Sequence, residues 1–193
     1  MSEARGLRAS VIDQQLITYL MDSHAVEEQA LALLRRARRA CTRGELSAIY
    51  EEHLDRAELH GQLLADRLQS HDSRPSALKD AAMRLGARNW SVIFQAHPVT
   101  PGRATAMLFA LTHLKIAGYE LLRSIATRAA DEATVELTEQ MLADERAAAA
   151  RLSASFDDAV EASLDAPEPA GNVLGGLRRT LTLGAERAPL GSV

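Results

Sequence analysis

Four carboxylates interrupt or border apolar helix faces in this sequence. Glu27 and Glu145 each occupy a position that the three- and four-residue spacing of their apolar neighbours assigns to a buried face. Asp55 and Glu58 lie one turn apart, beside another such face. Burying a carboxylate is costly unless it is protonated, paired with a cation or bound to a metal ion. The residues most able to carry chemistry are therefore Glu27, Asp55, Glu58 and Glu145.

Inward carboxylates on helices are typical of bundles that bind iron or manganese. The full pattern takes one Glu from each of two helices and a Glu-x-x-His pair from each of the other two. This sequence contains no Glu-x-x-His, and Asp55-x-x-Glu58 offers only oxygen ligands in its place. His53 and His60 share the same predicted helix and could face inward or outward. Glu27, Asp55, Glu58 and Glu145 are nevertheless the candidate ligands for iron or manganese.

A rival interpretation pairs the buried glutamates with cations of the chain itself. The predicted third long helix carries Thr112, His113 and Lys115 at mid-height, and no carboxylate before Glu120. The Lys115 ammonium could stand where a metal ion would otherwise lie. Both interpretations, bound metal and internal ion pairing, stay open at this point.

Helical periodicity predicts the elements that hold these residues. Four long helices are expected over about 10–41, 44–71, 101–129 and 131–164, with a shorter one over about 76–95. Thr100 followed by Pro101 is a helix-start signal, and Asp131 can cap the fourth long helix. The sequence thus predicts an all-α four-helix bundle over 10–164, after a flexible segment over 1–9 and before a flexible tail rich in Gly and Pro over 165–193.

The composition supports a helical protein and excludes several functional classes. The chain has 193 residues, of which 35 are alanine, 47% are hydrophobic and 25% are charged. A formal charge of −4 argues against nucleic-acid binding. A single cysteine, Cys41, excludes an internal disulfide and a multi-cysteine zinc site. No apolar run is long enough to span a membrane and the first residues are polar, so we expect a cytoplasmic protein with no membrane partner.

Four short segments, in order along the chain, resemble a bacterial ferritin-like stress family typified by YciF. They are Leu-Met-Asp-Ser-His-Ala-Val-Glu-Glu-Gln at 20–29, Glu-Glu-His-Leu-Asp-Arg-Ala at 51–57, Leu-Thr-His-Leu-Lys-Ile-Ala-Gly-Tyr at 111–119 and Leu-Ala-Asp-Glu-Arg at 142–146. The resemblance implies a ferritin-like bundle and a carboxylate-bridged di-iron centre. It places Glu27, Asp55, Glu58 and Glu145 at or near liganding positions.

The same resemblance implies that the iron site is weak or lost. Thr112 and Lys115 stand where the family has two glutamates, and Ala149 stands where it has an aspartate. We therefore predict a structural or interaction protein of bacterial stress or iron handling that forms homo-oligomers and is not an enzyme. The first alternative is a carboxylate-bridged iron-binding protein or di-iron oxidase.

The tail suggests a second alternative. Residues 171–193 alternate aliphatic residues with glycine and include Arg178-Arg179. They resemble the C-terminal peptides that load cargo into encapsulin shells, which implies a shell protein as partner. In that case the tail would be the functional element.

Overall fold

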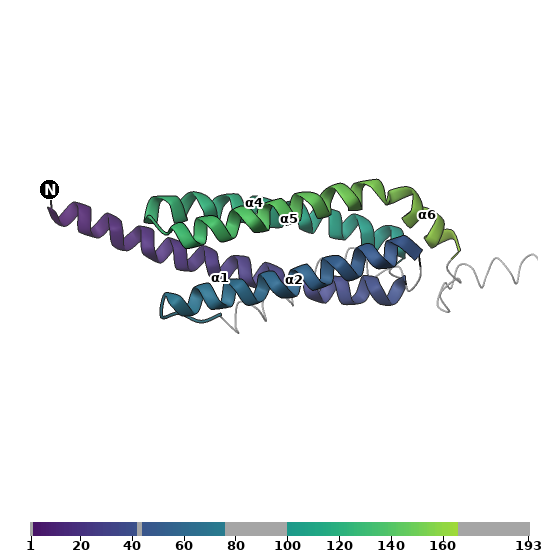
Figure 1. Cartoon of the computed structure of the whole chain (residues 1–193), viewed down its shortest axis with the longest axis horizontal. Coiled ribbons are helices and arrows are strands. Elements are labelled where there is room, and N and C mark those ends of the chain that lie inside the picture. Colours follow the sequence, from purple (N-terminus) through teal and green to yellow (C-terminus); the bar gives the residue numbers. More distant parts are fainter. Residues whose placement is uncertain (1, 42–43, 76–99, 166–193) are drawn as a thin grey trace, which may run out of the picture.

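The computed structural model describes residues 2–41, 44–75 and 100–165, and these form five α-helices and no strand. The helices are α1 (Ser2–Ala40), α2 (Gly44–Ser70), α4 (Pro101–Ala129), α5 (Glu132–Ala154) and α6 (Phe156–Leu164). The four long helices lie side by side in one elongated bundle (Figure 1). The all-α four-helix bundle expected from the sequence is therefore confirmed. The helix predicted over 76–95 and all but the first residue of the tail predicted over 165–193 lie outside the described residues.

Helix α4 lies between two other long helices of the bundle. It packs along α1 on one side and α5 on the other, while α2 packs mainly against α1. In Figure 1, α2 ends and α4 begins at opposite ends of the bundle. The residues at mid-height of α1, α2, α4 and α5 therefore share one interior, which is where the candidate site lies.

Helices α4 and α5 begin where the sequence predicts, because a capping side chain precedes each of them. Thr100 accepts a hydrogen bond from the Arg103 backbone N–H, with Pro101 in the first turn of α4. Asp131 accepts one from the Thr134 N–H at the start of α5. These caps satisfy backbone donors that have no partner within the helix. At the other end of the chain, α1 begins at Ser2, earlier than the predicted start at 10, because no proline interrupts the helical run.

The fourth long helix, predicted as continuous over 131–164, is divided in two. It breaks at Ser155, whose backbone N–H and side-chain hydroxyl both donate to the Leu152 carbonyl. The short helix α6 then packs against α4. There the Gly102 N–H donates to Ser163 Oγ at 2.8 Å, and a Cβ on Gly102 would lie 3.1 Å from that oxygen. The apolar periodicity of the sequence does not predict this break, because it continues from Leu152 through Phe156 to Val160.

Two apolar clusters fill the bundle. One includes Leu34, Tyr50, Leu108 and Leu152, and the other includes Leu20, Leu64, Leu122 and Met141. On each long helix one buried charged residue falls between these two clusters in sequence: Glu27, His60, Lys115 and Glu145. The site is therefore a polar layer with a hydrophobic core on each side of it.

A polar clasp joins α2 to the start of α5. Asp131 Oδ1 accepts a hydrogen bond from Arg67 Nη2 at 2.7 Å, and His71 Nε2 lies 2.9 Å from Asp131 Oδ2. Burial alone would raise the pKa of Asp131, but hydrogen bonds from Arg67 and Thr134 outweigh it and lower the pKa to about 2. The clasp therefore favours the ionised carboxylate in the folded state.

We expect Asp131→Asn to lower the free energy of unfolding by about 1–2 kcal/mol at pH 6 and by much less at pH 2. A carboxyl with a depressed folded pKa stabilises the protein above its unfolded value of 3.8, and this contribution is lost as the pH falls from about 4 to 2. Urea unfolding of both proteins across this range measures the difference. If the difference in free energy of unfolding between the two proteins does not change with pH, the Asp131 carboxylate does not have the stabilising role assigned to it.

Candidate metal centre

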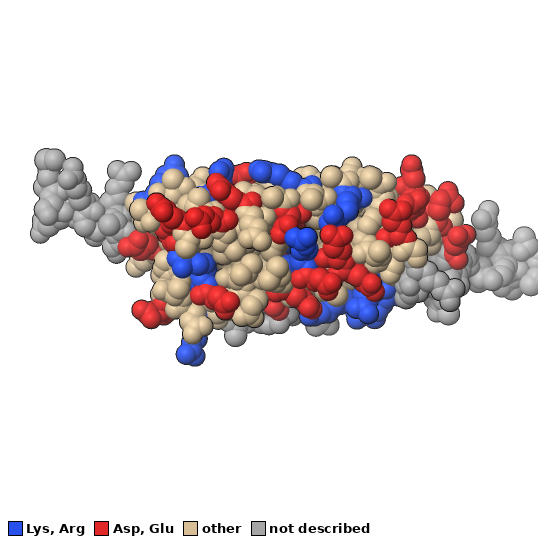
Figure 2. Space-filling view, in the orientation of Figure 1, with Lys and Arg blue, Asp and Glu red and all other residues tan. Residues whose placement is uncertain are grey.

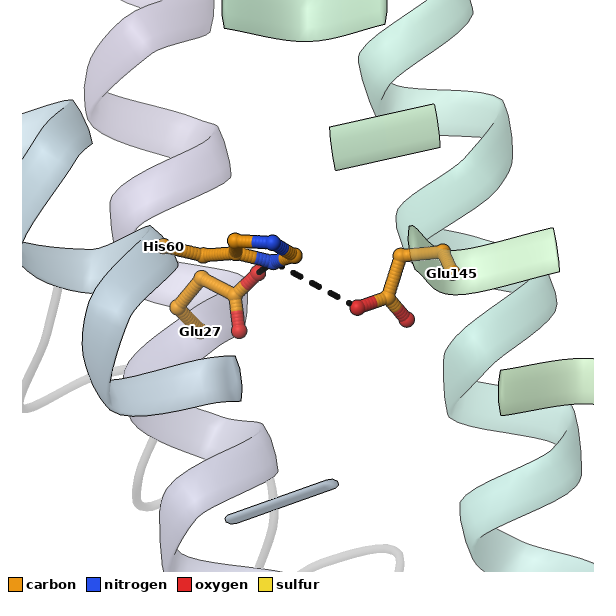
Figure 3. A group of neighbouring side chains, drawn as sticks. All are labelled: Glu27, His60 and Glu145. Atoms are coloured by element: carbon orange, nitrogen blue, oxygen red, sulfur yellow. Dashed lines mark ion pairs between the residues drawn. The ribbon is translucent and has the colours of Figure 1, made fainter. Parts of the chain in front are cut away.

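Four charged side chains from four different helices meet in the polar layer. Glu27 comes from α1, His60 from α2, Lys115 from α4 and Glu145 from α5. Their exposed fractions are 0%, 1%, 2% and 1%. Figure 3 shows Glu27, His60 and Glu145 pointing toward one another from three helices. We call these four residues the ion cluster.

Lys115 is the central cation of the ion cluster. Its Nζ donates a hydrogen bond to Glu145 Oε1 at 2.6 Å and lies 2.9 Å from Glu27 Oε2. Burial alone would lower the pKa of Lys115, but the charges of Glu27 and Glu145 outweigh burial and raise it. The ammonium is therefore held in its charged form between the two carboxylates.

His60 supplies a second positive charge. Its Nδ1 lies 3.4 Å from Glu27 Oε1 and 3.5 Å from Glu145 Oε1, while its Nε2 lies 3.2 Å from Asp144 Oδ2. Burial would lower the pKa of His60, but Glu145 and Glu27 raise it to about 9. At pH 7 the ring is therefore an imidazolium, and two cations balance two carboxylates.

The cluster continues outward as alternating charges. Asp144, which contacts His60, also accepts a hydrogen bond from Arg56 Nη1 at 2.6 Å. Arg56 lies at the surface, with 45% of its side chain exposed. From the centre of the bundle to solvent the order is thus ammonium, carboxylates, imidazolium, carboxylate and guanidinium.

Tyr119 also contacts Glu27. Its hydroxyl donates a hydrogen bond to Glu27 Oε1. Burial raises the pKa of Tyr119, and the negative charges of Glu27 and Glu145 raise it further, so the phenol keeps its proton and remains a donor. For Glu145, burial would raise the pKa, but the neighbouring rings of His53 and His60 and the charge of Lys115 lower it.

Some buried polar atoms of the layer have no hydrogen bond. Among the described residues these include Glu145 Oε2, Thr112 Oγ1 and both ring nitrogens of His53. His53 Nε2 lies 3.6 Å from Glu145 Oε2. Thr112 Oγ1 and His53 Nδ1 are thus potential ligand atoms with no hydrogen bond of their own.

The structure brings together only two of the four predicted metal ligands. Glu27 and Glu145 are in the ion cluster, whereas Asp55 and Glu58 are exposed on α2. Glu58 instead pairs with Arg35 at the surface, at 3.0 Å. The described residue group whose ligand atoms are close enough to hold one metal ion is Glu27, His60 and Glu145, all within 4.8 Å of one another.

The two histidines that turn inward have a signal in the sequence. Tyr50, His53, Ala57, His60 and Leu64 follow one another at intervals of three and four residues. Asp55 and Glu58 are each displaced by one or two residues from this series, which places them on the outer side of α2. The alternation of histidine with apolar residues therefore identifies the buried side chains.

Comparison with known proteins gives the family of the chain. The fold matches the E. coli stress protein YciF with a TM-score of 0.66 and 19% identity, over 78% of this chain and 97% of that one. It matches a protein from Xanthomonas campestris pv. campestris with a TM-score of 0.63 and 18% identity, over 80% and 96%. The family described as a domain of unknown function (DUF892) matches residues 12–165. The chain belongs to the DUF892 family.

Proposed function

We propose that this protein is a structural or interaction protein of the bacterial stress response, and that its bundle is held together by the ion cluster instead of a metal centre. The observation that carries the proposal is the position of Lys115, whose ammonium lies within 3 Å of both buried carboxylates. A divalent ion bridging Glu27 and Glu145 would have to take that place. The connection with stress comes from YciF, which is named as a stress protein.

The donor set does not fit a pair of iron ions. A carboxylate-bridged pair draws acidic ligands from all four helices of a bundle. Here α4 contributes Thr112 and Lys115 to the layer, and neither is a carboxylate. The carboxylates of α2 named from the sequence, Asp55 and Glu58, are exposed. Oxidase chemistry on two irons is therefore not part of the proposal.

The second candidate function is binding of a single metal ion. Glu27, His60 and Glu145 provide three ligand atoms within 4.8 Å, and His53 Nδ1 and Thr112 Oγ1 have no hydrogen bond. Binding would require the Lys115 ammonium to leave and His60 to lose its proton. The raised pKa values of Lys115 and His60 favour their charged forms and therefore disfavour both steps, so we place this function second.

Nuclear magnetic resonance of the lysine ammonium tests the proposal. The chain has only two lysines, Lys79 and Lys115, so Lys79→Arg leaves a single lysine in the protein. With 15N-labelled lysine we expect one Nζ cross-peak at pH 7, because burial between carboxylates slows exchange of its protons with water. The peak should stay sharp when Mn(II) is added.

Two results would contradict the proposal. Absence of the cross-peak at pH 7 would mean that Lys115 is not a fixed ammonium. Loss of the peak upon addition of a stoichiometric amount of Mn(II), reversed by a chelator, would favour the single-metal function. Lys79→Arg alone must leave the melting temperature unchanged for the comparison to hold.

A further inference from the structure

Two buried polar side chains beside the ion cluster make no hydrogen bond to another described residue. His53 on α2 is 3% exposed and Thr112 on α4 is 1% exposed. Both ring nitrogens of His53 and the hydroxyl oxygen of Thr112 are among the unpaired atoms. Burying such groups is costly unless each finds a hydrogen-bond partner. The two side chains therefore point to a bound molecule that can both donate and accept.

The hydroxyl of Thr112 differs from those of other buried threonines. Thr105 Oγ1 donates to the Pro101 carbonyl at 2.9 Å. Thr138 Oγ1 donates to the Thr134 carbonyl at the same distance. A threonine within a helix commonly makes this bond to the preceding turn. Thr112 makes no such bond in the described helix, so its hydroxyl remains available to the interior of the bundle.

Contacts between α2 and α4 place both side chains in one short section of the interior. The two helices run in the same direction (Figure 1). At one end of the section, the Tyr50 hydroxyl lies 2.7 Å from Thr105 Oγ1, and at the other end lies the ion cluster. His53 follows Tyr50 by one turn, and Thr112 precedes Lys115 of the ion cluster by one turn. The section is about 15 Å long, because each helix crosses it in ten residues.

Glu145 contributes a third polar atom to this section. Its Oε1 accepts the hydrogen bond from Lys115, whereas its Oε2 has no hydrogen bond to a described residue. Glu145 Oε2 lies 3.6 Å from His53 Nε2, which is too long for a direct hydrogen bond. Polar groups at such a separation are commonly bridged by water. Together with Thr112 Oγ1 they offer three partners, the usual number for a buried water molecule.

The neighbouring side chains at this level are small. Ala57 follows His53 by one turn on α2, and Ala148 and Ala149 follow Glu145 by about one turn on α5. All three alanines are buried. A methyl group fills little of the space that a leucine would take, so room remains beside the polar atoms. Space bordered by several polar atoms favours water over an apolar molecule.

Ion pairs close the seam between α2 and α5 outside His53. Glu52 pairs with Arg151 at 3.1 Å, and Arg56 pairs with Asp144 at 2.6 Å. Figure 2 shows acidic and basic side chains over the face that α2 and α5 turn toward the viewer. These pairs exclude bulk solvent from the layer. A water molecule inside them is therefore a fixed part of the structure that exchanges slowly.

We propose that ordered water is bound among His53, Thr112 and Glu145 and bridges α2, α4 and α5 inside the bundle. The site lies beside the ion cluster and requires no metal ion. It goes beyond the proposed function, because it concerns polar atoms that the ion pairs leave without a hydrogen bond. Its tests leave Lys115 unchanged, so the failure of one proposal is distinguishable from the failure of the other.

The sign of the stability change in Thr112→Val gives the first test, with EDTA present throughout. Valine has nearly the shape of threonine but no hydroxyl. If water bridges the site, the substitution removes one of its partners and should raise the unfolding equilibrium constant by roughly 5- to 30-fold. If the hydroxyl is unpaired, its removal relieves a desolvation cost and the constant falls. A fall in the unfolding constant would overturn the proposal.

A double-mutant cycle tests whether His53 and Thr112 share the water. Once Thr112→Val has disrupted the site, His53→Leu should raise the unfolding constant less than it does in the wild type, by roughly threefold or more. The matched control is Thr138→Val, whose hydroxyl bonds within α5 and whose effect should be independent of His53→Leu. Independent effects of Thr112→Val and His53→Leu would contradict a shared water molecule.

Magnetisation transfer from water in the wild type gives a test that requires no variant to fold. With 13C-labelled threonine methyl groups, we expect a water cross-peak at Thr112 that persists in EDTA. Thr105 is the internal control and should show none, because its hydroxyl is paired with Tyr50 and Pro101. The proposal fails if Thr112 shows no cross-peak. It also fails if EDTA removes the cross-peak, since the water would then belong to a metal ion.

Discussion

Lys115→Met is expected to lower the free energy of unfolding by about 3–5 kcal/mol at pH 7. The substitution keeps most of the side-chain volume and removes only the ammonium. Glu27 and Glu145 would then share one imidazolium, His60, in a layer that excludes water. Breaking a buried ion pair is costly because the remaining charge has no solvent to compensate it. Chemical denaturation followed by circular dichroism measures the loss.

The matched control for this prediction is a surface ion pair. Arg35 and Glu58 lie 3.0 Å apart, each with 52% of its side chain exposed, so Arg35→Met should change the stability by less than about 1 kcal/mol. Adding Glu27→Gln and Glu145→Gln to Lys115→Met should recover part of the loss, because the unpaired charges are removed. A Lys115→Met protein as stable as the Arg35→Met control would contradict the role assigned to Lys115.

Lys115→Glu is expected to convert the ion cluster into a metal site that holds about one divalent ion per chain. The variant has three carboxylates and His60 in place of two carboxylates and two cations. Such a net negative set of oxygen and imidazole ligands suits Mn(II) or Fe(II). Without metal, the carboxylates repel one another and the variant should be less stable than the wild type.

The metal-bound variant should regain stability. At a free metal concentration 100-fold above the dissociation constant, the gain is about 2.7 kcal/mol. Lys115→Gln is the matched control, since it removes the ammonium but adds no carboxylate, and should retain less metal than the glutamate variant. If Lys115→Glu takes up no metal and is not stabilised by it, the layer lacks the geometry of a metal site.

Much of the fold follows from the sequence because local rules decide it. The cap residues Thr100 and Asp131 set the starts of α4 and α5, and their hydrogen bonds are as expected. The sequence does not predict the break at Ser155, because the apolar series Leu152, Phe156 and Val160 continues across it. The described helices contain no stretch long and apolar enough to cross a membrane.

The candidate site is predicted in part. Glu27 and Glu145 stand out because each lies alone within an apolar series, and Lys115 is the alternative cation that can balance their charges. On α2, the sequence prediction selects Asp55 and Glu58 as ligands because they are carboxylates. The helical phase of α2 instead buries His53 and His60, so position on the helix outweighs ligand type.

The presence of lysine at position 115 fits its role. Of the 22 basic Lys and Arg residues in the chain, 20 are arginine. A compact ammonium can donate to carboxylates on different helices from one point, whereas a planar guanidinium requires a fork of partners in its own plane. Lys115 contacts Glu27 on α1 and Glu145 on α5 with a single nitrogen.

Metal content of the wild type tests the central claim most directly. The protein is incubated anaerobically with excess Fe(II), desalted and analysed for elements, with Lys115→Glu prepared in parallel as the positive control. If the Lys115 ammonium fills the place between Glu27 and Glu145, the wild type retains far less than one iron per chain while the variant retains about one. One or two tightly held irons per wild-type chain, lost in Glu27→Gln and Glu145→Gln, would contradict it.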